Sequence, residues 1–193
     1  IKEMASFDFI SYDLSILTGQ ASLALRKCSK PVIAMVNGAA AGAGCGIALG
    51  ADFRIMTEES CLLTAFSSVG LPGDTGCIYH LKQIVGLAKT IELMALSPRI
   101  YGKEAFRLGL TTRLAPDGKL EEETQAFAEK LLRRPLSALA LQKQLYYEVF
   151  YRDYMAYSRL EAENLAKAGA SADHREAVTA FIEGRKPVFN QKN

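Results

Sequence analysis

The chain has 193 residues, 49% of them hydrophobic, which is enough to form one well-buried core without stabilising cross-links. Its net charge is +2 and its basic and acidic residues are interleaved, so the composition gives no bias toward nucleic acid. The 2 histidines, His80 and His174, lie in unrelated contexts and argue against a transition-metal site. No apolar run reaches the roughly 20 residues that a membrane-spanning helix needs.

The cysteines lie in apolar or glycine-rich settings, without Cys-x-x-Cys spacing: Cys28, Cys45, Cys61 and Cys77. We expect them to be reduced thiols in the core. This predicts a cytoplasmic protein, or one of the mitochondrial or peroxisomal matrix in a eukaryote. The chain shows no secretory signal and begins with Ile1 rather than Met, and we expect further residues upstream.

In chain order, apolar residues at helical spacing first predict a helix over 5–27. The apolar stretch 31–36 predicts a buried strand. The residues that follow, 37–46, include nothing larger than Asn or Cys and predict a turn that opens a short helix over 44–50. A ligand can approach the backbone of such a turn closely, and the first N–H groups of the helix can stabilise a negative charge on oxygen.

The remaining elements form two groups. Strands and helices alternate at first, with strands expected at 52–57, 61–65 and 110–114 and helices at 76–97 and 102–109. The loop 70–76 holds one acid, Asp74, and Gly86 is a candidate break in the helix after it. From residue 120 the pattern predicts only helices, at 120–132, 136–151, 153–169 and 174–184. This order indicates an α/β core over residues 1–119, followed by a helical region over residues 120–193.

Several segments match, in order, the motifs of one protein family: Lys30–Gly38, Ala51–Ile55, Gly70–Asp74, Ile84–Lys89, Ala105–Leu110, Asp173–Ala177 and Phe181–Phe189. Their combination resembles the enoyl-CoA hydratase/isomerase (crotonase) superfamily over essentially the whole chain. The resemblance implies an α/β crotonase (ClpP-like) spiral of ββα units with a helical C-terminal trimerisation segment. It also implies a homo-trimer or hexamer that takes an acyl-CoA thioester as its substrate, with no cofactor, metal, nucleic-acid or membrane partner.

The resemblance further implies an oxyanion hole, in which two backbone N–H groups hold the thioester oxygen and stabilise an enolate. The second donor corresponds to Ala43, and the residues on either side of it, Gly42 and Gly44, are expected to bind substrate. The first donor corresponds to a segment before Ile1, so we expect the chain to lack an N-terminal part of the fold and half of the oxyanion hole.

The two glutamates of hydratases in this superfamily correspond to Gly46 and Phe66, so both acids are absent. Addition of water across a conjugated double bond needs a base for the water and an acid for the α-carbon. The residues at these two positions therefore argue against a hydratase.

Asp74 occupies a position at which several superfamily members carry an acid. In enoyl-CoA isomerases of the Δ3,Δ2 or related type, that acid moves one proton between two carbons. We favour this role, because one carboxylate can both remove and return the proton and an apolar pocket raises its pKa. The residues expected to bind substrate beside Asp74 are Phe66, Val69, Gly70 and Leu71.

Two other functions remain open. In 4-chlorobenzoyl-CoA dehalogenase the corresponding acid attacks the aromatic ring, so a dehalogenase-like or other ring-modifying acyl-CoA enzyme is the first alternative. That enzyme has Trp where this chain has Phe66. The second alternative is a non-catalytic CoA-binding scaffold, which the loss of both hydratase glutamates keeps open.

The resemblance also places CoA contacts near both ends of the chain. In the superfamily a Phe and a Lys, three residues apart near the C-terminus, contact the CoA of a neighbouring subunit. Phe181 matches the Phe, Gly184 takes the Lys position, and Arg185 is the adjacent cation. Lys2 is a candidate contact for the CoA phosphate or adenine, with a solvated lysine as the alternative.

Several of these residues also have simpler interpretations. Asp74 precedes Thr-Gly at a helix start, where an N-cap is the alternative role. We expect Tyr79 and His80 on the helix surface or in the core, and Cys45 as a small core residue. The C-terminal aromatic residues are expected to pack helices, with one or two near substrate: Tyr146, Tyr147, Phe150, Tyr151, Tyr154 and Tyr157.

Overall fold

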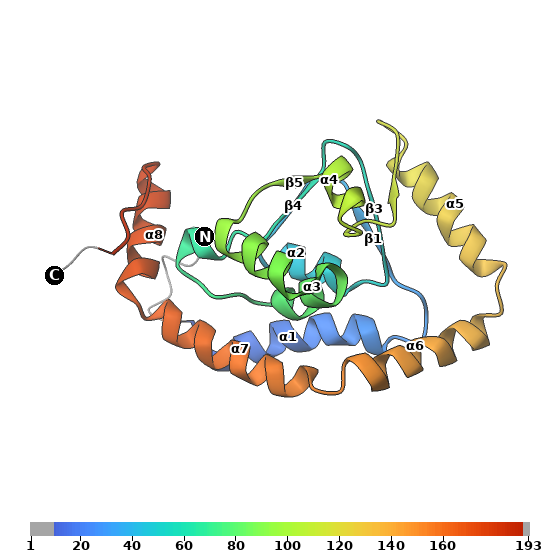
Figure 1. Ribbon diagram of the computed structural model, residues 1–193, viewed down its shortest axis with the longest axis horizontal. Coiled ribbons are helices and arrows are strands. Elements are labelled where there is room, and N and C mark those ends of the chain that lie inside the picture. Colours follow the sequence, from blue (N-terminus) through green and yellow to red (C-terminus); the bar gives the residue numbers. More distant parts are fainter. Residues whose placement is uncertain (1–9, 191–193) are drawn as a thin grey trace.

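The structure, a computed structural model, describes residues 10–190. After helix α1 (Tyr12–Lys27), the chain forms two units that each contain two strands and a helix (Figure 1). The first unit comprises β1 (Ile33–Val36), β2 (Ala39–Ala41) and α2 (Ala43–Gly50). The second comprises β3 (Phe53–Met56), β4 (Cys61–Leu63) and α3 (Cys77–Leu96), with a 3₁₀ turn, η2 (Ser67–Val69), before α3.

Each strand of the first unit pairs in parallel with the corresponding strand of the second, so the chain advances as a spiral. One sheet has the order β1-β3-β6, with Ile33 opposite Phe53 and with β6 (Arg113–Leu114) parallel to β3. The other has the order β2-β4-β5, with Ala39 opposite Cys61 and β5 (Ile100–Tyr101) antiparallel to β4. Helix α4 (Gly102–Arg107) leads from one sheet to the other.

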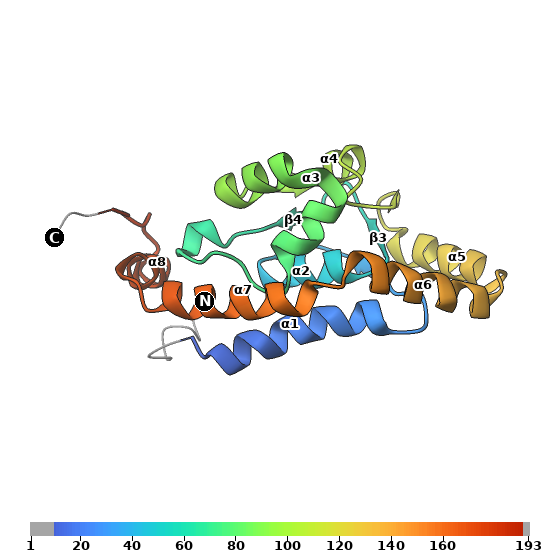
Figure 2. The same ribbon diagram turned by 60° about the horizontal axis from the view of Figure 1, so that its bottom comes forward.

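The last part of the described chain is helical and runs as an arc along the spiral (Figure 1). Its helices are α5 (Leu120–Leu132), α6 (Leu136–Phe150), α7 (Tyr154–Gly169) and α8 (Ala172–Glu183). Helix α7 lies beside α1 in both ribbon views (Figures 1 and 2), and the two helices pack together extensively. Helices α6 and α7 therefore pack along α1, whereas α5 packs against β1 and β3 and α8 against η2.

The main core lies between the sheets and α2, α3 and α4. Its most deeply buried members are apolar side chains of these elements and of the segment after α4: Leu49, Met56, Leu62, Cys77, Leu81, Ala105 and Leu110. A second cluster joins α1 and α3 to the C-terminal helices through Leu23, Tyr79, Tyr151 and Tyr154. Edge-to-face packing of the aromatic rings adds to the burial of their area there.

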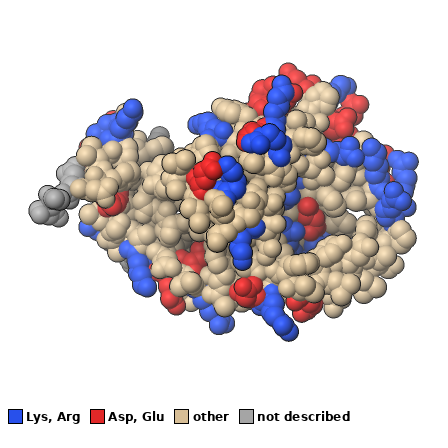
Figure 3. Space-filling view, viewed as in Figure 1, with Lys and Arg blue, Asp and Glu red and all other residues tan. Residues whose placement is uncertain are grey.

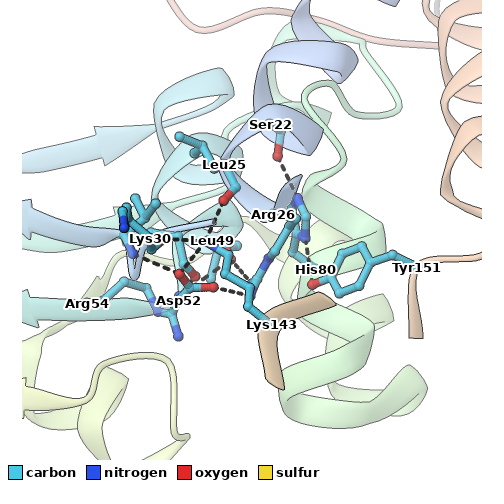
Figure 4. A network of polar contacts seen from close by, with 12 residues as sticks. Ser22, Leu25, Arg26, Lys30, Leu49, Asp52, Arg54, His80, Lys143 and Tyr151 are labelled. Atoms are coloured by element: carbon cyan, nitrogen blue, oxygen red, sulfur yellow. Dashed lines mark hydrogen bonds and ion pairs between the residues drawn. The ribbon is translucent and has the colours of Figure 1, made fainter. Parts of the chain in front are cut away.

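A buried polar network joins α6 to the start of the spiral (Figure 4). The Lys143 Nζ donates to the carbonyl oxygens of Leu25 at 2.8 Å and Lys30 at 2.9 Å and pairs with Asp52 at 2.6 Å. Asp52 also pairs with Arg26 at 3.4 Å. Because a buried ammonium requires such partners, this network holds α6 against the end of α1.

Most of the predicted elements are present, but several differ in their bounds and β5 was not predicted. The predicted break at Gly86 is confirmed, since this residue has φ 75° and ψ 169° inside α3. The small-residue run was expected to form only a turn, but 39–41 form strand β2 by pairing with β4. The strands at 61–65 and 110–114 are shorter than predicted, and Cys28 is exposed whereas the other three cysteines are buried. The predicted helix 5–27 is seen from Tyr12, and residues 5–9 lie outside the described range.

Basic and acidic side chains are interspersed over the face shown in Figure 3. Neither sign forms a single field across that face. Within residues 10–190, no helix has the length and apolarity needed to cross a membrane.

Candidate active site

The turn before α2 exposes the first backbone N–H groups of that helix. Gly42 has φ 55° and ψ −121°, and its N–H donates to the Leu63 carbonyl at 2.9 Å, which fixes the turn to β4. Ala43 and Gly44 follow as exposed residues at the start of the helix. Because the first N–H groups of a helix have no intrahelical acceptor, this turn can bind an oxygen that carries negative charge.

The loop from Gly73 to Gly76 carries Asp74 and has an unusual backbone. Gly73, Thr75 and Gly76 have φ values of 154°, 56° and 70°. The left-handed conformation is a genuine outlier for a β-branched residue such as Thr75 and costs on the order of 1–3 kcal/mol. The surrounding contacts must therefore hold this loop in its shape.

Thr75 connects the Asp74 loop to the turn. Its hydroxyl oxygen lies 2.7 Å from the Asp74 carbonyl oxygen and 3.3 Å from the Ala43 carbonyl oxygen, and its one proton is shared between these two acceptors. Gly46, one turn further along α2, lies directly against Thr75. A Cβ at position 46 would overlap the Thr75 hydroxyl and would lie 2.9 Å from its Cβ and 3.2 Å from its carbonyl oxygen. Two residues singled out in the sequence, Ala43 and Asp74, thus belong to contacting segments.

Asp74 is half-buried, and its Oδ1 atom accepts two hydrogen bonds. The Thr18 hydroxyl of α1 donates at 2.5 Å and the Thr75 N–H at 2.6 Å. Burial raises the pKa of Asp74, and these two hydrogen bonds oppose that shift. The result is a carboxylate that holds a proton more readily than an exposed aspartate does. Asp74 is not the N-cap of α3, because that position is Gly76.

A second buried carboxylate, Glu161, lies against the same loop and was not singled out from the sequence. It comes from α7, is 8% exposed, and accepts hydrogen bonds from the Gly76 N–H at 2.9 Å and the Tyr157 hydroxyl at 2.6 Å. Burial raises its pKa to about 7. The sequence holds one signal for this acid, which is its position in a stripe of residues at helical spacing: Tyr154, Ser158, Glu161 and Leu165. The structure shows that this stripe is buried, and a buried glutamate is unusual. Thr18 was also missed, because an isolated threonine on a helix carries no such signal.

The loop before Asp74 contains the other residues expected to bind substrate. Phe66 and Leu71 are buried, whereas Val69 and Gly70 are half-buried. The Phe66 ring lies 3.9 Å from the position of a Cβ on Gly42, so it borders the turn. The Val69 carbonyl accepts a hydrogen bond from the His174 ring at 2.7 Å, which ties this loop to α8.

The residues expected to contact CoA lie apart from the turn or outside the described range. Phe181 is 52% exposed on α8. Arg185 pairs with Glu176 and Glu183, each at 2.6 Å, so its charge is engaged within the chain. Lys2 lies outside residues 10–190.

His80 and its aromatic neighbours are core residues rather than members of the candidate site. His80 is fully buried, with its Nε2 2.6 Å from the Ser22 hydroxyl and its Nδ1 3.4 Å from the Tyr151 hydroxyl (Figure 4). Burial lowers the pKa of His80 to about 3, so its ring is neutral at physiological pH. Tyr79 and Cys45 are also buried. Of the C-terminal aromatic residues, Tyr151 and Tyr154 are buried, whereas Tyr146 and Phe150 are exposed.

Two surface cavities lie away from the turn. One of about 390 Å³ lies between α1 and α7, where Ile16 and Met155 contribute to its lining. The other, of about 310 Å³, is bordered by Arg26 and Lys143. Within residues 10–190, no group of three or more His, Cys, Asp or Glu side chains could hold a metal ion.

A parallel ββα spiral with an accessible helix N-terminus beside a half-buried carboxylate defines a protein of the crotonase fold. The sequence matches the family model for "Enoyl-CoA hydratase/isomerase" over residues 1–192. A protein from Rhodobacter capsulatus named "Probable enoyl-CoA hydratase" is 38% identical over 166 residues, which cover 86% of this chain and 65% of that relative. The 1,2-epoxyphenylacetyl-CoA isomerase of Escherichia coli is 35% identical over 168 residues, which cover 87% of this chain and 64% of the relative.

A solved structure shows the same architecture. The enoyl-CoA hydratase of Mycobacterium avium subsp. paratuberculosis has a TM-score of 0.88 and 28% identity, covering 94% of this chain and 74% of that chain. The chain belongs to the enoyl-CoA hydratase/isomerase family. It spans slightly less than two thirds of the length of the two relatives named above. Their names include both a hydratase and an isomerase, so membership alone does not select one reaction.

Proposed function

We propose that the protein moves the double bond of an enoyl-CoA thioester, with Asp74 as the only proton carrier and the Ala43 N–H as one donor to the thioester oxygen. Family membership supports a CoA thioester as the substrate. The link from Thr75 to the Ala43 carbonyl at 3.3 Å supports joint action of the turn and the Asp74 loop.

The observation that carries this proposal is the contact between Gly46 and Thr75. Position 46 corresponds to one of the hydratase glutamates, and even a Cβ there would lie 2.9 Å from the Thr75 Cβ. A glutamate at this position would displace the loop that holds Asp74. The other hydratase position is Phe66, which is 5% exposed and apolar. Neither position that corresponds to a hydratase glutamate therefore carries an acid, whereas water addition requires a base and an acid there.

The proposed reaction transfers one proton within the substrate. The Asp74 carboxylate removes a proton from C2 of a 3-enoyl-CoA, and the electron pair spreads over the chain to the thioester oxygen. The N–H groups at the start of α2 stabilise this dienolate. The protonated Asp74 then returns the proton to C4, and the double bond moves from C3–C4 to C2–C3. The raised pKa of Asp74 suits both steps, since the group must accept a proton and then release it.

This scheme needs no cofactor, because no electrons or groups leave the substrate. We extend the proposal to contacts between CoA and the cation or aromatic residues expected from the sequence, Lys2, Phe181 and Arg185. Arg185 would have to exchange at least one of its pairs with Glu176 and Glu183 to do so. A homo-trimer or hexamer and a cytoplasmic or matrix location remain predictions.

The test is to measure the conversion of a 3-enoyl-CoA to the conjugated thioester, whose formation is monitored by its ultraviolet absorbance. Asp74→Asn should lower kcat by about 10²–10⁴-fold, the range for loss of a general acid–base group. Asp117→Asn, at an exposed aspartate, is the matched control and should leave kcat unchanged. Full activity of Asp74→Asn would refute the assignment. Binding of acyl-CoA without conjugation would instead favour a ring substrate, tested with 4-chlorobenzoyl-CoA, or a scaffold.

A further inference from the structure

The buried carboxylate of Glu161 has no role in the proton transfer described above. It is 8% exposed on α7, and both of its oxygens accept hydrogen bonds. None of the ion pairs formed within residues 10–190 includes Glu161. Burying a carboxylate without a cation is costly, so its retention at this place calls for an explanation.

Glu161 accepts a hydrogen bond at one end of the loop that carries Asp74 and lies near the other end. At one end, its Oε2 accepts the Gly76 N–H at 2.9 Å. At the other, its Oε1 lies 3.7 Å from the position that a Cβ on Gly73 would occupy. The middle of the loop faces other elements, since Asp74 accepts from Thr18 of α1. The loop is thus held from two sides, by α7 at Gly76 and by α1 at Asp74.

The groups that interact electrostatically with Glu161 are all acids. They are Asp74 on the loop, Cys77 on α3, and Tyr154 and Tyr157 on α7. Burial is the main cause that raises the pKa of Glu161 to about 7, and the negative charge of Asp74 raises it further. The hydrogen bonds that Glu161 accepts from Tyr157 and from the Gly76 N–H lower this pKa and so oppose the rise. Glu161 therefore changes its charge near neutral pH, next to the proposed proton carrier.

We propose that Glu161 is a positioning residue, which fixes the Asp74 loop by accepting the Gly76 N–H and does so more strongly as a carboxylate than as a neutral acid. The inference rests on the proposed role of Asp74 for its effect on turnover. Its structural part, the control of the loop by the proton on Glu161, is independent of any reaction.

The direct test follows the Gly76 amide by NMR in the purified protein between pH 5 and 9. In the wild type its chemical shift should titrate with a midpoint near pH 7. Glu161→Gln keeps the side-chain volume and one acceptor oxygen but has no proton to lose, so this titration should disappear. Glu163→Gln, at an exposed glutamate on the same helix, is the matched control and should leave it intact.

The kinetic test separates positioning from general destabilisation. With a 3-enoyl-CoA as substrate, kcat of the wild type should rise with pH through about 7, and Glu161→Gln should lack this rise. Its kcat at pH 8 should fall by about 5- to 10-fold, the difference between a hydrogen bond to a charged acceptor and one to a neutral acceptor, with KM little changed. Glu161→Asp should recover the pH dependence in part, since the charge returns but the side chain is shorter.

The outcomes distinguish the two proposals. If no variant or wild type forms the conjugated thioester, the proposed function fails, and the Gly76 titration still decides the role of Glu161. If the wild type is active but Glu161→Gln keeps the same Gly76 titration or the same pH profile, the positioning role is wrong. A fall in both kcat and melting temperature with an unchanged pH profile would also overturn it, because that result describes a purely structural residue.

Discussion

Gly46→Ala is the sharpest test of the geometry at the candidate site. The added methyl group would lie 2.9 Å from the Thr75 Cβ and 3.2 Å from the Thr75 carbonyl oxygen. Rotation of the Thr75 side chain can move its hydroxyl but neither of these two atoms. The loop or helix α2 must therefore shift, and with it the relative position of Asp74 and the turn.

The expected loss of stability follows from two opposing effects. Overpacking of a well-packed site costs about 1–3 kcal/mol. Alanine gains up to about 1 kcal/mol over glycine inside a helix. We expect a net loss of about 1–2 kcal/mol in the free energy of unfolding, which corresponds to about 2–8 °C in melting temperature for a chain of this size.

Urea unfolding and calorimetry measure this loss, with Gly44→Ala as the matched control. A Cβ on Gly44 meets nothing within 4 Å, so this variant should be as stable as the wild type or more stable. In the double variant Gly46→Ala/Thr75→Gly the overlaps with the Thr75 hydroxyl and Cβ are absent, and only the 3.2 Å approach to the carbonyl oxygen of residue 75 remains. Glycine also tolerates the φ of 56° at position 75. The two changes should then couple by about 1 kcal/mol or more. Equal stability of Gly46→Ala and Gly44→Ala would refute the reasoning.

Two other predictions concern the buried polar groups outside the site. Lys143→Met removes the cation closest to Asp52 and should lower the free energy of unfolding, measured in urea, by about 3–5 kcal/mol. The control Lys130→Met, at an exposed position of α5, should lower it little. A loss below about 1 kcal/mol for Lys143→Met would contradict the role of the network. Because burial lowers the pKa of His80 to about 3, below the unfolded value, the unfolded chain binds the extra proton between these pKa values. As the pH is lowered below about 6.5, the free energy of unfolding of the wild type should therefore fall by about 1.4 kcal/mol per pH unit more than that of His80→Gln. If the two proteins lose stability in parallel, His80 is not buried as a neutral ring.

The sequence predicted the alternation of strands and helices because apolar periodicity is strong in those segments. The strand at 39–41 was missed, since three alanines carry no preference for a strand and their pairing with β4 depends on residues 22 positions away. Cys28 was assigned to the core from its neighbours in the sequence, yet it lies at the exposed end of α1. In both cases tertiary contacts, not local composition, decide the outcome.

In the candidate site, too, some residues could be predicted from the sequence and others only from the folded chain. Ala43 and Asp74 were located through motifs, and the structure adds that Thr75 joins their segments. Thr18 and Glu161 lie far from the loop in sequence, on helices where a threonine or a glutamate is ordinary. Only the folded chain shows that both side chains contact this loop.

The hydrogen bond from Gly76 to Glu161 limits how this protein can be recombined with its relatives. A chimaera that joined the ββα units of this chain to the C-terminal helices of another family member would keep Ala43 and Asp74. It would lose the acceptor of a buried N–H unless the donor helix carried an acid or amide at the position of Glu161. An unpaired N–H of this kind costs about 1–3 kcal/mol. The C-terminal helices are therefore not an interchangeable module, because they supply part of the environment of the Asp74 loop.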